Sequence, residues 1–349
     1  MPINKYIQDL KNLSEPRKTF MEIMKVNRSE VHMANLLAYF FRSEENHKLG
    51  NIFVEALLMT NSYSLDLNEN ESKSILFKRK RKLIKDSEGQ FIFQDAIEEQ
   101  ILENEKEIQE FIKLLTPVYV KTEDPTSTTD KKQKRIDFVL TTNECVICIE
   151  FKINHELNNP LEIYQNHIVE IEKKFQEEHN LQRDLFFVVL TPFKKPPSIS
   201  VQRFIDRDDG KANVFSQVIL SHFFKNLTNK IPKEYFKENT NNYSSQYLTD
   251  LIQTINNREI NFKRHEVLKS LEIYLNNSNL NSVFHSKKGF VEIKTAKCNF
   301  KIRFFDNQHF QIERWSADNK RLETYNPIDL SVPNIFELTL KNLNEIESF

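Results

Sequence analysis

The stretch RIDFVLTTNECVICIEFKI, residues 135–153, decides the fold. Residues 136–140 and 145–153 are rich in β-branched and aromatic side chains, which favour strands, and residues 141–143 (TTN) favour a turn. The pattern therefore predicts two short strands joined in a hairpin.

Three charged residues, here called the charged triplet, interrupt this apolar hairpin: Asp137, Glu150 and Lys152. Because successive side chains on a strand point to opposite faces, Glu150 and Lys152 share one face, while Ile149 and Phe151 lie on the other. Burying a charge costs several kcal/mol unless the charge is paired or binds a metal, so an apolar strand rarely carries two charges by accident.

Two interpretations of the charged triplet follow. In the first, the hairpin lies on the surface, and Glu150 and Lys152 form ion pairs with each other or with Arg135. In the second, Asp137 and Glu150 form a pocket of hard oxygen ligands, which suits Mg²⁺ or Mn²⁺. Such an ion polarises a phosphodiester oxygen and activates a bound water, and the ammonium of Lys152 can orient that water or stabilise negative charge.

The charged triplet resembles the signature of the PD-(D/E)XK nuclease superfamily, an Asp at the end of one strand and (Asp/Glu)-x-Lys on the next. Asp137 matches the first part and Glu150-Phe151-Lys152 the second, with Ile136 in the position of the Pro that names the motif. The resemblance implies an α/β fold with a restriction-endonuclease-like core, a mixed sheet flanked by helices in the order αβββαβ. It also implies a Mg²⁺- or Mn²⁺-dependent nuclease, in which Asp137 and Glu150 bind the metal and Lys152 positions or activates the attacking water.

A second stretch, NRSEVHMANLLAYFFRSEENHKLGNIFVEALL at residues 27–58, resembles the N-terminal signature of one family within this superfamily. Ser29 can cap a helix over residues 30–42, and a second helix is expected from about residue 49 to 58. Glu30 can add a ligand for the metal or its water, although the helix dipole alone also favours a Glu at a helix start. The residues that match the signature are Glu30, His32, His47 and Gly50.

Further positions match the superfamily pattern more weakly. A strand before the hairpin ends near Glu123, where the related family often carries a Glu. A helix is expected over residues 161–179, with Tyr164 and Gln165 at positions that face the site in the superfamily. Each can equally be an ordinary helix-surface residue. Residues 185–191 (LFFVVLT) predict a central strand that is buried on both faces.

The densest basic run of the chain supplies candidates for phosphate contacts: Lys78, Arg79, Lys80, Arg81 and Lys82. A run of this kind is otherwise a solvated face. Residues 95–115 predict a long acidic helix, and residues 214–227 have aromatic and aliphatic side chains at helical spacing.

The 349 residues allow one large or two ordinary domains. We expect a nuclease core with N-terminal helices over residues 1–230 and an accessory helical and antiparallel β region over residues 231–349. Within that C-terminal α+β extension, three pieces predict a β-meander: residues 290–295, 300–305 and 309–315. Glu292 and Lys294 repeat the E-x-K spacing there, but the preceding strand supplies no Asp, so we expect them to be exposed strand residues.

Composition limits the function. The 49 Lys and Arg nearly balance 50 Asp and Glu, so a phosphate-binding surface must be local, and four glycines leave no Gly-rich nucleotide loop. The absence of a long apolar run or signal segment favours a cytoplasmic protein without membrane contact. We expect nucleic acid, in particular DNA, as the partner, and a homodimer for double-strand cleavage. The alternative is an inactive or trigger-activated subunit of the same fold that binds nucleic acid or protein, for instance in bacterial anti-phage defence.

Overall fold

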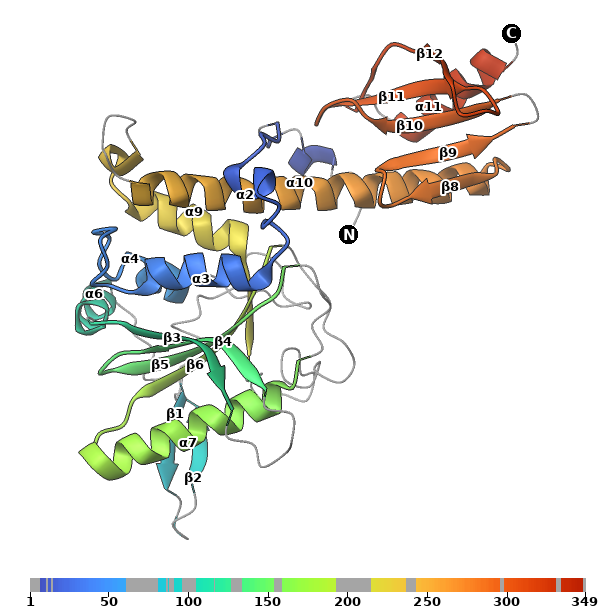
Figure 1. Cartoon of the computed structure of the whole chain (residues 1–349). Coiled ribbons are helices and arrows are strands. Elements are labelled where there is room, and N and C mark those ends of the chain that lie inside the picture. Colours follow the sequence, from blue (N-terminus) through green and yellow to red (C-terminus); the bar gives the residue numbers. More distant parts are fainter. Residues whose placement is uncertain are drawn as a thin grey trace. The chain divides into compact units, whose positions relative to one another are not determined.

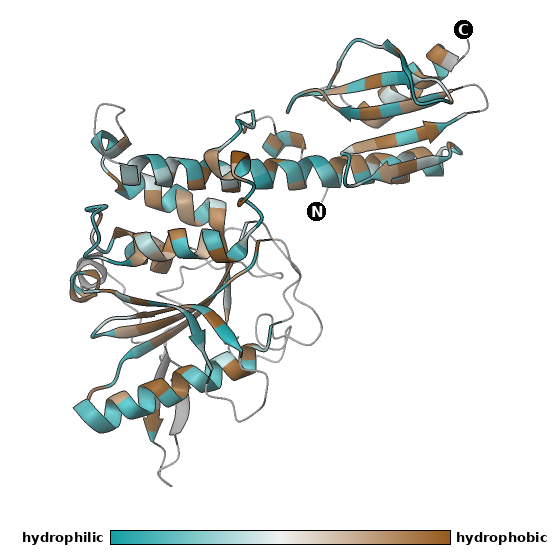
Figure 2. Ribbon diagram, in the orientation of Figure 1, coloured by the Kyte–Doolittle hydropathy of each residue, from teal (hydrophilic) through white to brown (hydrophobic). Residues whose placement is uncertain are grey.

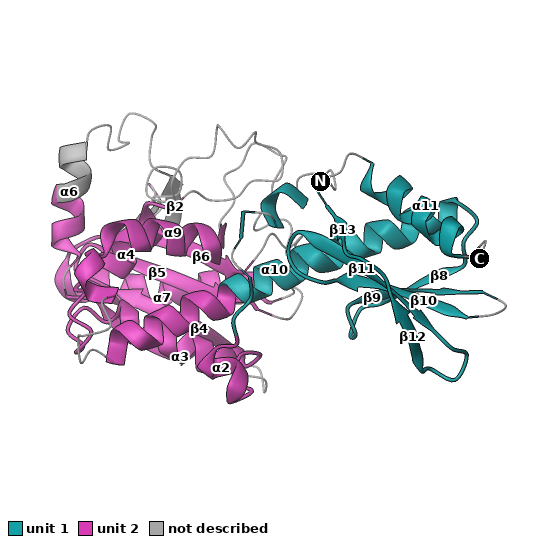
Figure 3. Ribbon diagram, turned by 90° about the horizontal axis from the view of Figure 1, so that it is seen from above, with its two compact units in different colours: residues 1–17, 256–349 teal, residues 18–255 magenta. Residues whose placement is uncertain are grey.

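The computed structural model divides the chain into two compact units (Figure 3). One unit is Lys18–Ile255, and the other combines Met1–Arg17 with Asn256–Phe349. The structure describes residues 7–10, 12–13, 15–60, 81–85, 87, 91–95, 105–115, 117–126, 134–153, 159–192, 215–236, 243–295, 298–330 and 334–347.

The larger unit is built on a mixed sheet with the strand order β2-β1-β6-β5-β4-β3, seven-stranded over the described residues because β7 also pairs with β6. Its strands β3, β4 and β5 are antiparallel, whereas β5, β6 and β7 are parallel. A parallel connection needs a crossover, which α7 (Leu161–His179) supplies between β5 and β6. The strands are β1 (Arg81–Lys85), β2 (Phe91–Asp95), β3 (Tyr119–Pro125), β4 (Arg135–Thr141), β5 (Cys145–Phe151), β6 (Asp184–Thr191) and β7 (Ser216–Ile219).

The predicted hairpin is confirmed as β4 and β5. Phe138 lies opposite Ile149, and Leu140 lies opposite Ile147. The turn is held by Thr142, whose hydroxyl accepts hydrogen bonds from the N–H groups of Glu144 and Cys145 at 3.1 and 2.9 Å. Every residue of β5 is buried, so Glu150 lies in a buried central strand and the hairpin is not a surface hairpin.

Helices cover both faces of this sheet (Figure 1). On one face lie α3 (Glu30–Phe41), α4 (Ile52–Leu58), α9 (Leu220–Lys230) and the first turns of α10 (Tyr243–Asn277); α7 lies on the other. Because successive side chains of β5 point to opposite faces, Ile147 and Ile149 pack in the core shared with α3, α4 and α9. Val146 and Cys148 pack in the core shared with α7. Figure 2 shows the result, apolar central strands beneath helices of mixed hydropathy. The predicted mixed sheet flanked by helices is confirmed.

Two local predictions were wrong. Residues 216–219 form β7, and the helix α9 begins only at Leu220, because Val218 and its neighbours pair with β6 and this pairing outweighs their helical spacing. The acidic helix expected over residues 95–115 does not begin at Asp95, which ends β2 opposite β1. The described part of this helix is α6, Glu105–Leu114, and residues 96–104 lie outside the described residues. Two short helical elements also lie among the described residues of this unit: α2 (Phe20–Ile23) and the 3₁₀ helix η3 (Lys233–Phe236).

The smaller unit packs an antiparallel sheet against helices. The sheet has the order β12-β11-β10-β9-β8, with β13 also on β11, and the predicted meander corresponds to β9, β10 and β11. The later part of α10 and α11 (Ile335–Glu347) share its core. Its strands are β8 (Ser282–His285), β9 (Phe290–Lys294), β10 (Asn299–Phe304), β11 (His309–Trp315), β12 (Arg321–Thr324) and β13 (Ile328–Asp329).

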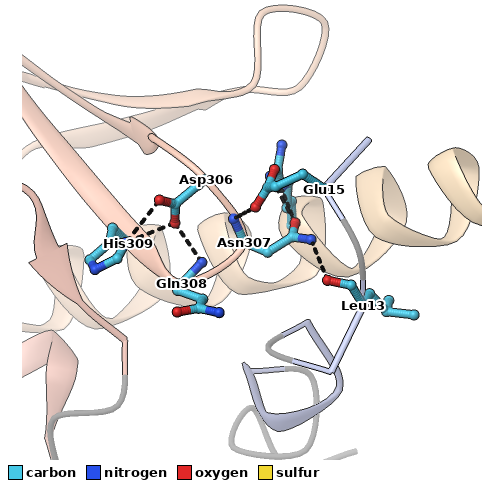
Figure 4. Close-up of polar contacts among 7 residues, drawn as sticks. Leu13, Glu15, Asp306, Asn307, Gln308 and His309 are labelled. Atoms are coloured by element: carbon cyan, nitrogen blue, oxygen red, sulfur yellow. Dashed lines mark hydrogen bonds and ion pairs between the residues drawn. The ribbon is translucent and has the colours of Figure 1, made fainter. Parts of the chain in front are cut away.

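The N-terminal segment belongs to this smaller unit (Figure 4). Asn307 is buried; its side chain donates to the carbonyl of Leu13 at 3.1 Å, and its N–H donates to the carboxylate of Glu15. Arg264 donates to the same two side chains, Glu15 and Asn307. The sequence places residues 1–17 with the first domain, whereas these contacts join them to the C-terminal region.

The boundary between the units falls within α10, at residues 255 and 256, and not near residue 230. The first turns of α10 bury Leu248, Leu251 and Ile255 in the core that also contains α3, α4 and α9. A polar segment between residues 232 and 244 therefore precedes a helix that still belongs to the larger unit. No helix in the described ranges has the length and apolar character that a membrane crossing requires.

We predict that Arg183→Ala destabilises the protein without affecting its chemistry. Glu172 is fully buried on α7 and accepts hydrogen bonds from the N–H and the Nε of Arg183, both at 2.9 Å. Removing one partner of a buried ion pair leaves an unpaired charge and costs about 3–5 kcal/mol. Urea denaturation measures the loss, with Lys174→Ala, an exposed lysine of the same helix, as a control. Equal stability of the two variants would contradict a structural role for the Glu172–Arg183 pair.

Candidate active site

Four charged side chains meet where β5 ends and α3 begins. Lys152, directly after β5, places its Nζ 2.9 Å from Oε1 of Glu150 and 3.4 Å from Oε2 of Glu30. Glu30 also accepts a hydrogen bond from the N–H of Ile153 at 2.9 Å, and Asp137 on β4 accepts one from the N–H of Phe151 at 2.7 Å. The end of β5 therefore fixes a carboxylate from each of three elements.

The start of α3 explains the position of Glu30. Ser29 caps the helix by accepting a hydrogen bond from the N–H of His32, so Glu30 is its first residue. A Glu there is favoured by the helix dipole, and this one is additionally directed to Lys152 and Ile153. Glu30 can therefore stabilise the helix start and contribute to the site at the same time.

Glu150 is the most confined of these groups, with 1% of its surface exposed. Its Oε1 accepts hydrogen bonds from Lys152 and from the side chain of Asn159. Its Oε2 is buried and accepts none from the part of the chain that the structure describes. A buried carboxylate oxygen without a donor is destabilising, and a bound cation would satisfy it.

Burial shifts the acid–base behaviour of the carboxylates. It raises the pKa of Glu150 to about 8, with the charge of Asp137 adding to the effect. It raises the pKa of Asp137 to about 6, although the N–H of Phe151 and the charge of Lys152 oppose the shift. Without a cation Glu150 therefore retains its proton near neutral pH, whereas Asp137 loses its proton above about pH 6. Binding a cation would release the proton of Glu150.

Lys152 shifts in the opposite sense to an isolated buried lysine. Burial lowers its pKa, but the carboxylates of Glu150, Glu30 and Asp137 outweigh burial and leave the pKa raised. The side chain is therefore held as an ammonium ion. It can orient a nucleophile or stabilise negative charge, and it is a poor proton acceptor.

Asn159 supports the site, and the sequence did not single it out. Its side-chain amide donates to Glu150 and also to the hydroxyl of Tyr164 at 3.2 Å. Tyr164 is buried on α7, where burial and the charge of Glu150 raise its pKa. Its sequence signal is the Asn-Asn-Pro segment at residues 158–160, which favours a turn and does not indicate a role in the site.

The other candidates lie at varying distances from this centre. Glu123 has a left-handed backbone (φ 51°) and pairs with Arg135 at 3.5 Å, but its charge still raises the pKa of Asp137. His32 is exposed, and its ring contacts the Ser29 hydroxyl at the helix cap. Gln165 is half-buried on α7, and no hydrogen bond within the described ranges joins it to the charged triplet.

Two groups of sequence candidates serve other roles or cannot be placed. His47 is buried and contacts the carbonyl of Arg42 and the N–H of Leu49, so it holds the loop between α3 and α4. In the basic run, Lys78, Arg79 and Lys80 lie outside the described residues, and Arg81 and Lys82 begin β1.

Asp124, next to Glu123, is buried at the end of β3 and was not a predicted site residue. It lies 3.0 Å from Nε2 of His167 on α7 and forms a second ion pair with Lys121. These partners make it part of the contact between β3 and α7.

The family of the chain follows from its sequence over this same region. The sequence model of the PD-(D/E)XK nuclease superfamily matches residues 19–249, more than half of the chain. The chain belongs to the PD-(D/E)XK nuclease superfamily. No curated protein matches it. The match covers Glu30 and the charged triplet and ends inside the larger unit, so the superfamily fold is the fold of that unit.

The second E-x-K of the chain differs from the superfamily motif. Lys294 is exposed as expected, but Glu292 is largely buried on β9 and lies 3.0 Å from Nε2 of His285. The prediction of an exposed Glu292 was wrong, because the neighbouring β8 supplies a partner that the sequence did not reveal as a strand.

We predict that Glu150→Gln stabilises the metal-free protein increasingly as the pH rises. The pKa of Glu150 is about 8 in the fold and 4.5 in the unfolded chain, so the wild type loses stability between these pH values. The slope is at most about 1.4 kcal/mol per pH unit, and glutamine has no such loss. Thermal unfolding in EDTA at pH 5 to 8 measures it.

The same experiment repeated in Mg²⁺ provides the control. Mg²⁺ should raise the melting temperature of the wild type more than that of Glu150→Gln, since only the wild type offers the second carboxylate. A melting-temperature difference that is independent of both pH and Mg²⁺ would contradict the assignment of Glu150.

Proposed function

We propose that this PD-(D/E)XK protein is a metal-dependent nuclease that hydrolyses phosphodiester bonds in DNA. The observation that carries the proposal is the unsatisfied Oε2 of buried Glu150 beside Asp137, with the ammonium of Lys152 at the same strand end. A buried and a half-buried carboxylate with raised pKa values, beside a fixed cation, are typical of a catalytic site.

The residues fit Mg²⁺ or Mn²⁺. Asp137 and Glu150 come from adjacent strands and offer carboxylate oxygens, which hard cations prefer. Within the described ranges no group of three or more His, Cys, Asp or Glu side chains is placed to hold a metal ion, so the protein ligands are these two carboxylates. This suits Mg²⁺, which is usually held by one or two carboxylates and completes its shell with water and substrate phosphate.

Each residue of the site would have its own role in hydrolysis. A bound divalent cation would polarise the phosphodiester and lower the pKa of a water. Asp137 and Glu150 would hold it, and Asn159 would fix the carboxylate of Glu150. Lys152, kept charged by its carboxylate neighbours, would orient the attacking water and stabilise negative charge on the phosphate. Glu30 would fix the ammonium of Lys152.

The chain order of the larger unit supports a finer fold proposal. The elements α3, β3, β4, β5, α7 and β6 follow one another in the order αβββαβ. We propose this set as the nuclease core and the smaller unit as its C-terminal extension. A homodimer would bring two such cores to a duplex, and light scattering would detect it.

Cleavage tests this function directly. We predict that the wild type cuts DNA in Mg²⁺ or Mn²⁺ but not in EDTA, and that Lys152→Ala lowers the rate by about 10²–10³-fold, as expected for removal of a transition-state donor. Plasmid, single-stranded DNA and RNA substrates separate the nucleic-acid classes. Lys173→Ala, which removes a lysine from an ion pair on the surface of α7, is the matched control.

The outcomes are distinguishable. Cutting that survives Lys152→Ala would sink the assignment of the site. Silence on every substrate, combined with Mg²⁺ binding that is lost in Asp137→Ala, would support instead a trigger-activated or binding subunit of the same fold.

Glu30→Gln separates the two roles open to Glu30. The amide can still accept from the N–H of Ile153 but no longer pairs with Lys152. If Glu30 positions Lys152, we expect kcat to fall about tenfold at an unchanged Mg²⁺ midpoint, equivalent to about 1.4 kcal/mol. A rightward shift of the Mg²⁺ titration with normal kcat at saturation would show that Glu30 serves the metal.

A further inference from the structure

The sheet of the smaller unit has two chemically different faces. Cross-strand register places Val291, Ile302 and Ile312 side by side on the face that shares a core with α10 and α11. The alternate residues point the other way. Here this second face is called the outer sheet face; its members on β9, β10 and β11 are Phe290, Glu292, Lys294, Asn299, Lys301, Arg303, Gln311, Glu313 and Trp315.

Aromatic rings are prominent on the outer sheet face. The Nζ of Lys301 lies 3.7 Å from the ring centroid of Trp315 and 5.3 Å from that of Phe290, so it sits between the two rings. Phe305 continues the same alternation after β10, since its N–H donates to the carbonyl of His309, and 59% of its surface is exposed. Trp315 and Phe290 are half-buried, so the face offers one exposed ring beside two partly accessible ones.

On this face the acidic side chains are buried and the basic side chains that pair with them are exposed. Glu313 is 1% exposed, and its carboxylate binds the guanidinium groups of Arg303 and Arg321. It also accepts a hydrogen bond from the indole N–H of Trp315 at 3.1 Å. One buried acid therefore fixes two exposed arginines and the largest ring of the face.

A similar arrangement occurs on β9. Glu292 is largely buried and pairs with His285. Lys294, two residues later on the same face of the strand, has 64% of its side chain exposed. The carboxylates lie beneath and the cations lie outside. The outer sheet face therefore presents positive charge to solvent even though the whole chain is nearly neutral.

We propose that the outer sheet face binds a single strand of nucleic acid. Exposed bases would stack on Trp315, Phe290 and Phe305, and phosphates would contact Lys294, Arg303 and Arg321. Stacking on flat aromatic rings beside fixed cations is the general chemistry of single-strand binding, and paired bases in a duplex cannot reach such rings. The choice of ligand rests on the proposed nuclease function, but binding itself does not require cleavage.

Trp315 provides a direct probe because it is the only tryptophan of the chain. The full chain is titrated in EDTA with a 20-nucleotide oligothymidylate, the matching oligouridylate and a duplex of the same length. Base stacking should quench the Trp315 emission with either single strand. The strand that quenches at the lower concentration shows whether the face prefers DNA or RNA. Quenching by the duplex at equal or lower concentration would overturn the proposal.

Point variants assign the binding to this face. With a fluorescein-labelled single strand, Trp315→Ala should weaken binding at least tenfold and Phe305→Ala several-fold. Lys294→Gln should lower the slope of log K against log salt by about one. The controls are Tyr247→Ala, an exposed aromatic of the larger unit, and Lys341→Gln, an exposed lysine of α11, and both should bind as the wild type does.

The results separate this proposal from the nuclease function. Phe305 and Lys294 are exposed, so their variants test binding even if Trp315→Ala fails to fold. Wild-type affinity in both, with unquenched Trp315, would overturn the outer sheet face as a binding surface whether or not the protein cleaves. Loss of binding in them while the wild type shows no cleavage would retain this inference and remove the nuclease function.

Discussion

The larger unit depends on one costly feature, a glutamate buried in the middle of its sheet. Glu150 lies on β5, which pairs with β4 on one side and β6 on the other and is buried along its whole length. Such a position is normally apolar, because an unpaired charge there costs several kcal/mol. The surrounding groups are arranged around this carboxylate: Lys152 directly after the same strand, Asn159 before α7, and Tyr164, whose hydroxyl accepts from Asn159.

The same constraint explains the position of α3. Lys152 shares its ammonium between Glu150 and Glu30, and Glu30 is anchored to the N–H of Ile153. The helix start is thereby joined to the end of the central strand. Phe41, at the other end of α3, packs against Phe53 and Phe223. An electrostatic contact and an apolar contact thus fix the two ends of one helix.

Much of this was predictable because the signals are local. The hairpin could be predicted from β-branched runs around a turn, α3 from its Ser29 cap, and β6 from a continuous apolar run. The charged triplet was predictable because charges in an apolar strand are conspicuous. These features depend on residues close in sequence, so no knowledge of the fold was needed.

The features that were missed depend on partners far away in the sequence. β7 has the apolar spacing of a helix and becomes a strand only by pairing with β6. Residues 1–17 belong with the C-terminal region because Leu13 and Glu15 bind Asn307. Asn159 carries no sequence signal of its own, since its role follows from lying between Glu150 and Tyr164. No local pattern contains these relations.

The buried glutamates of the chain allow one more comparison. Glu172 is satisfied by Arg183, and Glu313 by Arg303, Arg321 and Trp315, so in both cases the chain itself supplies donors for the carboxylate. Glu150, equally buried, has donors at Oε1 but none at Oε2 among the described residues. The described part of the chain thus supplies donors for two buried glutamates outside the site but leaves this oxygen of Glu150 without one. The unsatisfied oxygen is therefore better explained by a ligand from outside the chain than by packing, and beside Asp137 the ligand that suits it is a hard cation.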